Sequence, residues 1–324
     1  MGRVLTKIGI DAIDSRDHTF SMTFHPDLEI LRRSINHVGL LQPITVRQKS
    51  RGSGYQVISG FKRLTVCEQL GLREVEAFSF AKLELADLEG FRMGLYENLA
   101  IRKLNLIEKS MVIEKLMRRF GLSREVIARD YMPMLGLQPG RRILAKMSQL
   151  VQLRPEIKRY IVEEGVSLEN AIGLLEFSRE DQVEIAGLVS ELKLGENKLK
   201  EVLTFLREIS LRDGLTMMEM VRGEIGEFAS DVALSKIQKT HRVRRRLREM
   251  RYPQLTQLEE DFRGKLKGLG LTPGISLRPP PYFEGDTFRL QFGFRNAGEF
   301  KAILSKLMEA SERSELGEMI DLVP

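Results

Sequence analysis

The stretch from Gly39 to Arg63 constrains the fold of this chain more than any other. It reads as the end of an amphipathic helix followed by four features in order: a strand over Ile44–Arg47, a Gly/Ser turn over Gly52–Gly54, a strand over Tyr55–Ser59 and a glycine that opens a helix at Phe61. A helix that starts directly after a strand and a glycine leaves its first N–H groups unpaired, and such an end attracts phosphate. Lys62 and Arg63 lie in the first helical turn, where the helix dipole disfavours cations. The stretch therefore predicts an anion-binding site.

The composition is that of a globular chain with two or three domains. The chain has 324 residues, of which 42% are hydrophobic and 30% charged. No apolar run is long enough to span a membrane, and the first residues lack the apolar core of a signal peptide. We therefore expect a cytoplasmic protein without a membrane partner. The net charge of +6 favours a polyanionic partner such as DNA.

The cysteine and histidine content limits the chemistry. Cys67 is the only cysteine, so the chain can form no internal disulfide, and its place on an apolar helix stripe predicts a small buried side chain. The four histidines, His18, His25, His37 and His241, show no metal-ligand spacing, and we expect no zinc site.

The alternation of strands and helices divides the chain. Up to residue 104, a strand over Val75–Phe80 and a helix over Leu83–Leu95 continue an α/β pattern, and this helix places Glu97 and Asn98 near its C-terminal end. From Asn105 helical periodicity takes over until about residue 275. We predict four segments: an α/β domain over 1–104, an all-α domain over 105–228, a basic helix or linker over 229–254 and a small α/β domain over 255–324.

Two short helices within the second segment have the form of a helix-turn-helix. Ser123 is the expected N-cap of the first, LSREVIARDY. The second, RRILAKMSQLVQL, presents polar side chains that could enter the major groove, namely Arg141, Arg142, Lys146, Ser148 and Gln149. The stretch between them, Met132–Gly140, has nine residues, whereas the usual turn has three or four. Either the turn is longer here or the extra residues form a small wing.

A later helix carries an unusual density of positive charge. Between Lys239 and Arg251 there are seven Lys or Arg residues and one acid, Glu249. Such a helix repels itself unless a polyanion or an acidic partner neutralises it. We predict non-specific contact with the DNA backbone, and the alternative is a solvated helix or linker. The arginines concerned are Arg242, Arg244, Arg245, Arg246 and Arg248.

The C-terminal segment predicts a small sheet with one helix. Phe288, Leu290, Phe292 and Phe294 alternate as in a half-buried strand, and a helix over Gly298–Ala310 follows. Two strands with one helix are too small to be stable alone. We therefore expect packing against the helix over Leu255–Leu269 or against a second copy, and the second alternative would form a homodimer.

Three motifs, GLLQPITVR, YQVISGFKRLTVCEQLG and ENLAIRKLNLIEKS, resemble the N-terminal domain of ParB partition proteins, whose fold is shared with sulfiredoxin. The resemblance implies an α+β multidomain protein with a ParB/sulfiredoxin-like α/β domain, a helix-turn-helix-like all-α domain and a small α/β C-terminal domain. It also implies a nucleoid-associated DNA-binding dimer, switched by CTP with Mg²⁺, and raises a partition ATPase as a partner. The implied nucleotide residues are Gln42, Gly60, Lys62, Arg63, Glu97 and Asn98, with Glu97 also near Mg²⁺.

The chain departs from the family motifs at three positions. Phe61 replaces a Glu, and Ala100 and Ile101 replace a Gln and an Arg. We therefore expect phosphate binding with at most weak CTP hydrolysis. Two alternatives stay open: a DNA-binding adaptor or transcriptional regulator with a degenerate pocket, and a nuclease or nucleotide hydrolase of the same fold. Nuclease activity is disfavoured because metal-dependent cleavage uses several carboxylates, and the motifs offer only Glu97.

Overall fold

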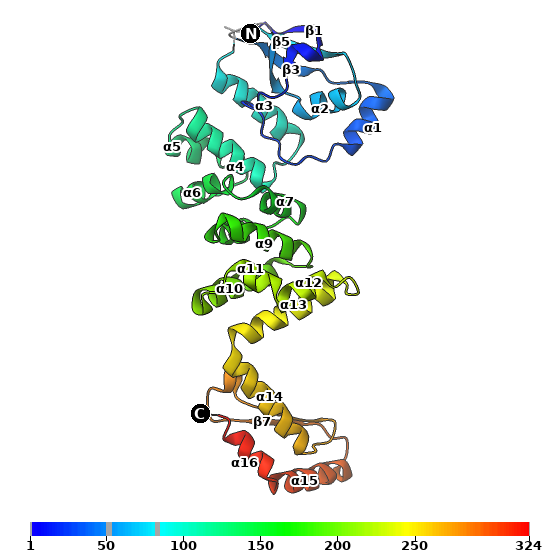
Figure 1. Cartoon of the computed structure of the whole chain (residues 1–324), viewed down its shortest axis with the longest axis vertical. Coiled ribbons are helices and arrows are strands. Elements are labelled where there is room, and N and C mark those ends of the chain that lie inside the picture. Colours follow the sequence, from blue (N-terminus) through cyan, green and yellow to red (C-terminus); the bar gives the residue numbers. More distant parts are fainter. Residues whose placement is uncertain (1, 50–53, 82–84, 324) are drawn as a thin grey trace. The chain divides into compact units, whose positions relative to one another are not determined.

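The computed structural model describes residues 2–49, 54–81 and 85–323 (Figure 1). They form two compact units, the first over residues 1–190 and 194–203 and the second over 191–193 and 204–324. The division between these units does not fall at the expected boundary after residue 104. Glu108 and Lys115, which follow that boundary, form hydrogen bonds to the backbone of Phe24 and His18 in the α/β part. The predicted Gly/Ser turn at Gly52 and Ser53 and the predicted helix start at Leu83 lie outside the described residues.

The first unit begins with a five-stranded sheet in the order β1-β5-β3-β4-β2. Antiparallel pairing joins β1 to β5 and β3 to β4, and parallel pairing joins β3 to β5 and β2 to β4. The elements of this part are β1 (Val4–Gly9), η1 (Ile10–Ala12), β2 (Ile13–Asp14), α1 (Glu29–Val38), β3 (Ile44–Gln48), β4 (Tyr55–Ser59), α2 (Phe61–Gln69), β5 (Glu74–Phe80) and α3 (Asp87–Ile101).

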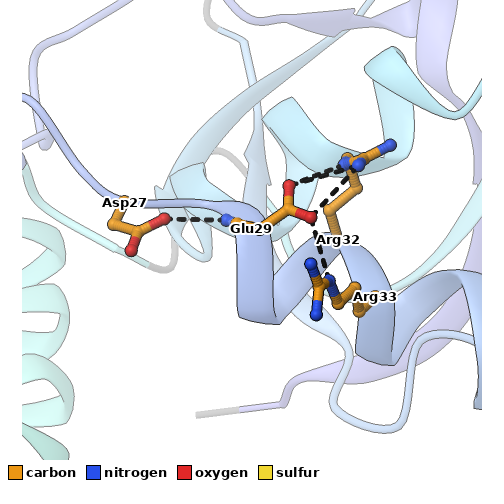
Figure 2. A network of polar contacts seen from close by, with 4 residues as sticks. All are labelled: Asp27, Glu29, Arg32 and Arg33. Atoms are coloured by element: carbon orange, nitrogen blue, oxygen red, sulfur yellow. Dashed lines mark hydrogen bonds and ion pairs between the residues drawn. The ribbon is translucent and has the colours of Figure 1, made fainter.

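Apolar side chains from α1 and α2 pack on this sheet. Ile35, Leu64 and Cys67 share one buried cluster with strand residues such as Ile44 and Val57. The prediction that Cys67 is buried is confirmed. Helix α1 starts at Glu29 and not directly after Pro26, because the Asp27 carboxylate accepts the Glu29 N–H and holds the preceding residues outside the helix (Figure 2).

Helix α3 packs closely against β4. A side chain at Gly94 would place its Cβ 2.8 Å from the Ile58 carbonyl oxygen, so only glycine permits this approach. The helix continues to Ile101, six residues beyond the expected end at Leu95, and Glu97 and Asn98 therefore lie inside it. The close packing brings these two side chains to the end of β4.

The rest of the first unit is helical, as expected. Its elements are α4 (Leu106–Glu114), the π-helix η3 (Lys115–Arg119), α5 (Arg124–Val126), the π-helix η4 (Ile127–Tyr131), α6 (Arg141–Leu150), α7 (Pro155–Glu163), α8 (Leu168–Gly173), η5 (Leu174–Glu176) and α9 (Arg179–Ser190), followed by the first part of α10 (Glu196–Asp213). The predicted N-cap Ser123 is confirmed, since its hydroxyl accepts the Val126 N–H.

The second unit contains the remaining elements. These are the last part of α10, α11 (Met217–Arg222), α12 (Glu224–Ser230), α13 (Lys236–Arg251), α14 (Pro253–Gly268), β6 (Ile275–Arg278), η6 (Pro281–Phe283), β7 (Arg289–Phe292), α15 (Ala297–Ser311) and α16 (Ser314–Ile320). Strands β6 and β7 pair antiparallel. Their cluster is completed by Phe262 of α14 and Met319 of α16, a helix that the sequence pattern did not predict.

The expected alternation along β7 is only partly confirmed. Phe288 packs on the cluster around Phe262, but Leu290 and Phe294 are exposed. The small domain therefore packs on α14, as expected, and leaves part of its apolar surface uncovered. In the described part of the chain, no helix has both the length and the apolar character needed to cross a membrane.

Candidate functional site

The glycine between β4 and α2 has a left-handed backbone conformation, which favours glycine. Gly60 has φ 97° and ψ 19°, in the left-handed region, and a Cβ there would lie 2.8 Å from Ile44 Cγ2. No side chain caps the start of α2. The first N–H groups of this helix therefore lack intrahelical partners and can receive an anion.

A pocket with a volume of about 200 Å³ opens at this helix start. It is bounded by the loop after β2, the end of β4, the first turn of α2 and the last turns of α3. The structure brings all six residues that the sequence assigned to the nucleotide site around it, namely Gln42, Gly60, Lys62, Arg63, Glu97 and Asn98. Two further cavity-lining residues, Phe20 and Met22, form an apolar side of the pocket.

Lys62 is one of the cations that line this pocket. Burial lowers the pKa of its ammonium group below the usual range, and the nearby Arg102 guanidinium lowers it further, whereas Glu108 and Asp27 act in the opposite direction. Within the described residues, Lys62 forms no hydrogen bond or ion pair. A negatively charged ligand bound beside Lys62 would therefore stabilise its ammonium group.

Arg63 is already bonded within the protein. Its Nη1 donates to the main-chain oxygens of Gln42 and Pro43, at 3.1 and 2.8 Å, and its Nη2 donates to Glu97 Oε1 at 2.8 Å. The guanidinium thus fixes the segment before β3 and also the end of α3. Any contact of Arg63 with a ligand would add to these structural bonds.

Two residues that the sequence interpretation did not assign complete the site. Arg102, just after α3, donates from Nε to Asn98 Oδ1 at 2.9 Å and from Nη1 to Glu108 Oε2 at 2.6 Å. Glu108 is 2% exposed and also accepts the Asn105 N–H. The signal that could have found Glu108 is the Asn105-x-x-Glu108 capping box at the start of α4.

The predicted helix pair for DNA keeps the long connection that its sequence suggested. The first helix ends at Tyr131 and α6 starts at Arg141, so residues 132–140 form a connection of nine residues. It opens with turns, in which Leu135 N donates to Tyr131 O, Gly136 N to Pro133 O and Leu137 N to Met132 O. The last two bonds have the pattern of a Schellman motif, with Gly136 at φ 66° as its left-handed residue. Residues 132–140 contain no strand, so the structure shows the longer turn and not a small wing.

Helix α6 exposes part of its predicted polar face. Leu144 and Met147 are buried, while Arg141, Arg142 and Gln149 are exposed. Arg141 pairs with Glu125 of the preceding helix at 3.3 Å. Lys146 and Ser148 are half-buried, and the Ser148 hydroxyl donates to the Ala145 oxygen.

The basic helix α13 is neutralised to a large extent by acids of the second unit. The acid partners come from α10, the α9–α10 connection, the segment around α12, α14 and α13 itself. The pairs are Lys239 with Glu191, Arg242 with Asp231, Arg245 with Glu249, Arg246 with Glu224 and Glu249, Arg248 with Glu259, and Arg251 with Glu208. Charge density alone therefore does not require a polyanion, and DNA contact by this helix stays a prediction.

Comparison with known proteins identifies the fold family of the first unit. Residues 1–99 match the model of the ParB N-terminal domain. A probable chromosome-partitioning protein ParB of Vibrio cholerae is 30% identical over 167 residues, which cover 52% of this chain and 54% of that protein. The N-terminal part of this chain belongs to the ParB N-terminal domain family.

Two further ParB-related proteins are similar to part of this chain. A nucleoid occlusion protein of Bacillus thuringiensis is 29% identical over 182 residues, covering 56% of this chain and 59% of that protein. A C-terminally truncated ParB from Caulobacter crescentus, solved in complex with CTP-gamma-S, is 27% identical and matches 56% of this chain and 97% of that chain, with a TM-score of 0.28. The chain spans little more than half the length of the two curated ParB-family relatives.

Two positions that depart from the ParB motifs line the pocket with apolar side chains. Phe61 also packs against the sheet cluster, and Ile101 is 71% exposed. Within the described ranges, no three His, Cys, Asp or Glu side chains gather closely enough to hold a metal ion. The pocket is lined by the cations Lys62, Arg63 and Arg102 together with apolar side chains such as Phe20 and Ile58.

Proposed function

We propose that this chain is a DNA-binding protein of the ParB type, acting in chromosome or plasmid partition, nucleoid occlusion or gene regulation. In this proposal its N-terminal pocket binds the phosphates of a nucleoside triphosphate, with CTP preferred. The observation that carries the proposal is the convergence of Lys62, Arg63 and Arg102 at the uncapped start of α2. The preference for CTP rests on ParB membership and not on the pocket geometry.

A path of direct contacts supports coupling between this pocket and the DNA-binding helices. The pocket residues Phe20 and Met22 belong to a loop whose backbone oxygens at His18, Thr19 and Ser21 accept hydrogen bonds from the Lys115 ammonium group of η3. One turn earlier in the same helical segment, the Ser110 hydroxyl donates to the Met147 oxygen of α6 at 2.5 Å. A nucleotide that prefers one arrangement of this loop changes DNA affinity by its differential affinity for the two arrangements.

Calorimetric titration with CTP, ATP, GTP and UTP, with and without duplex DNA, tests the nucleotide proposal. The informative variant is Lys62→Gln, because Lys62 forms no hydrogen bond or ion pair with another described residue. Replacing Arg63 would also remove its three hydrogen bonds to the protein. The matched control is Arg33→Gln on α1, whose guanidinium is 78% exposed and pairs with Glu29 (Figure 2).

We expect Lys62→Gln to weaken nucleotide binding by at least about tenfold, the effect of losing one charge-assisted hydrogen bond, and Arg33→Gln to leave it unchanged. Equal binding by Lys62→Gln and the wild type would contradict the assigned pocket. If no nucleotide binds the wild type under either condition, the chain is instead a DNA-binding adaptor with a degenerate pocket. That second reading is favoured by the apolar residues Phe61 and Ile101 at motif positions.

The DNA part of the proposal places α6 in the major groove, with Arg141, Arg142 and Gln149 toward the bases or phosphates. The helix α13 would add backbone contacts only by exchanging its internal carboxylate partners for phosphates. Gel-shift titration of Arg142→Ala against the wild type at several salt concentrations tests the role of α6. An unchanged affinity and salt dependence would remove α6 from the interface.

A homodimer is the proposed assembly, formed through the C-terminal part of the second unit. Phe294 is 54% exposed and Met308 is 70% exposed, which leaves apolar surface next to the small sheet. Light scattering of the wild type and of Met308→Lys measures this assembly, and a monomeric wild type would refute it. A partition ATPase stays a candidate partner, to be tested by co-purification with the ATPase encoded nearest to this gene.

A further inference from the structure

The residue just after α3 holds a buried guanidinium nitrogen without a partner. Arg102 uses Nε for Asn98 and Nη1 for Glu108, as described above. Its Nη2 is buried and, among the described residues, has no hydrogen-bond acceptor. An unsatisfied charged donor of this kind is costly to bury, and Arg102 lines the pocket at the start of α2. The nitrogen is therefore a donor that awaits an acceptor.

The position of Arg102 is fixed by a buried carboxylate. Glu108 accepts hydrogen bonds from Arg102 Nη1, from the Asn105 N–H at 3.1 Å and from the Phe24 N–H at 3.3 Å. These bonds join the loop after β2, the end of α3 and the start of α4 at one point. The guanidinium is thus preorganised, and a ligand would not need to order it.

One oxygen of Glu97 and the side-chain oxygen of Asn98 are already engaged by arginine. Glu97 Oε1 accepts from Arg63 Nη2 at 2.8 Å, and Asn98 Oδ1 accepts from Arg102 Nε at 2.9 Å. Mg²⁺ needs oxygen ligands in a near-octahedral arrangement, and a fixed guanidinium beside each oxygen repels it. The residues Glu97 and Asn98, as arranged in this chain, do not fit a Mg²⁺ ion held by protein oxygens.

We propose that Arg102 takes the place of the divalent cation at this pocket, with Nη2 donating to a phosphate oxygen of the bound nucleotide. This inference rests on the proposed function of the pocket. The lining of the pocket supports it, because Lys62, Arg63 and Arg102 are cations and, among the described lining residues, Glu97 is the one acid.

The experiment is calorimetric titration of the full chain with CTP and with inorganic tripolyphosphate, each in excess EDTA and in excess Mg²⁺. The variant pair is Arg102→Gln and the double change Arg102→Gln/Glu108→Gln. The double change avoids leaving the buried Glu108 carboxylate unpaired, so that a folded protein is available for titration. Thermal melting confirms folding, and Arg33→Gln is again the surface control.

We expect the wild type to bind both probes in EDTA with dissociation constants within about threefold of those in Mg²⁺, a difference under 1 kcal/mol. The folded double variant should lose at least about tenfold in EDTA, as for one charge-assisted hydrogen bond. Binding by the wild type only in Mg²⁺, or equal binding by the double variant in EDTA, would overturn the inference while leaving the pocket assigned. Absence of binding to either probe in both solutions would instead refute the proposed function itself.

Discussion

Replacement of Gly60 by alanine tests the structural basis of the pocket. Two effects add at this position. A left-handed conformation costs a non-glycine residue about 1–2 kcal/mol, and a Cβ at 2.8 Å from Ile44 Cγ2 and 3.2 Å from Ile44 Cα forces an overpacking cost of about 1–3 kcal/mol. We expect Gly60→Ala to lower the free energy of unfolding by about 2–5 kcal/mol in total.

The glycine just beyond the other end of α2 provides the control. Gly71 has φ 70°, but a Cβ there would meet no atom within 4 Å. Gly71→Ala should therefore cost only the conformational part, about 1–2 kcal/mol. Hydrogen exchange of the β3 and β4 amides measures the effect locally, so that unfolding of the second unit does not enter the comparison. Equal costs for the two variants would show that the Ile44 contact does not constrain this turn.

Three further measurements test other parts of the structure. Glu108→Gln should lower the free energy of unfolding by about 3–5 kcal/mol in urea titrations, because it leaves the Arg102 charge without its carboxylate partner. The surface control Glu29→Gln should cost under about 0.5 kcal/mol. Similar costs for the two variants would refute the role of the Arg102–Glu108 pair. Burial lowers the pKa of Lys115 from 10.5 to about 8. In the unfolded chain the Lys115 ammonium group therefore keeps its proton to higher pH than in the folded chain. The free energy of unfolding should rise between about pH 8 and 10.5, by about 1–2 kcal/mol after screening. Lys115→Met should remove this rise in pH-dependent urea titrations. Arg142→Ala should reduce the slope of log K against log salt by about 1 if this side chain contacts one phosphate, and an unchanged slope would exclude that contact.

Much of the first unit could be predicted from local sequence signals. The strand over Tyr55–Ser59 and the helix start at Phe61 are found at their expected residues, because β-branched runs, glycine and helical periodicity act over a few residues. The end of α3 was predicted six residues too early. Its length is decided by packing against β4 through Gly94, a contact between segments that are distant in the sequence.

The helix-turn-helix shows what local signals can and cannot predict. Pro133 and Gly136 are usual markers of a loop, and the nine-residue connection over residues 132–140 lies where the sequence predicted it. The sequence left open whether the extra residues form a longer turn or a wing. The structure shows turns there, with Met132 and Leu135 buried and with a hydrogen bond from Leu137 N to Met132 O.

The candidate site was predicted in its motif residues but not in its supporting charges. Lys62, Glu97 and Asn98 were found because they lie in recognisable motifs, and the structure places them around one pocket. Arg102 was missed because its role depends on a buried carboxylate six residues later and on an unpartnered nitrogen. Neither property is visible in a one-dimensional pattern of charge.

The basic helix α13 shows why a count of charges does not identify a partner. The sequence argument correctly required acids or a polyanion near its arginines, but acids from other segments, such as Glu208, Asp231 and Glu259, meet that requirement within the second unit. Binding of DNA at this helix would exchange a carboxylate for a phosphate at each arginine, so the gain per contact is a difference between two ion pairs. That difference is small for exposed pairs and falls with salt. Among the described residues, Arg142 of α6 is exposed and has no carboxylate partner to exchange. We therefore regard α6 as the stronger candidate for DNA affinity in this chain.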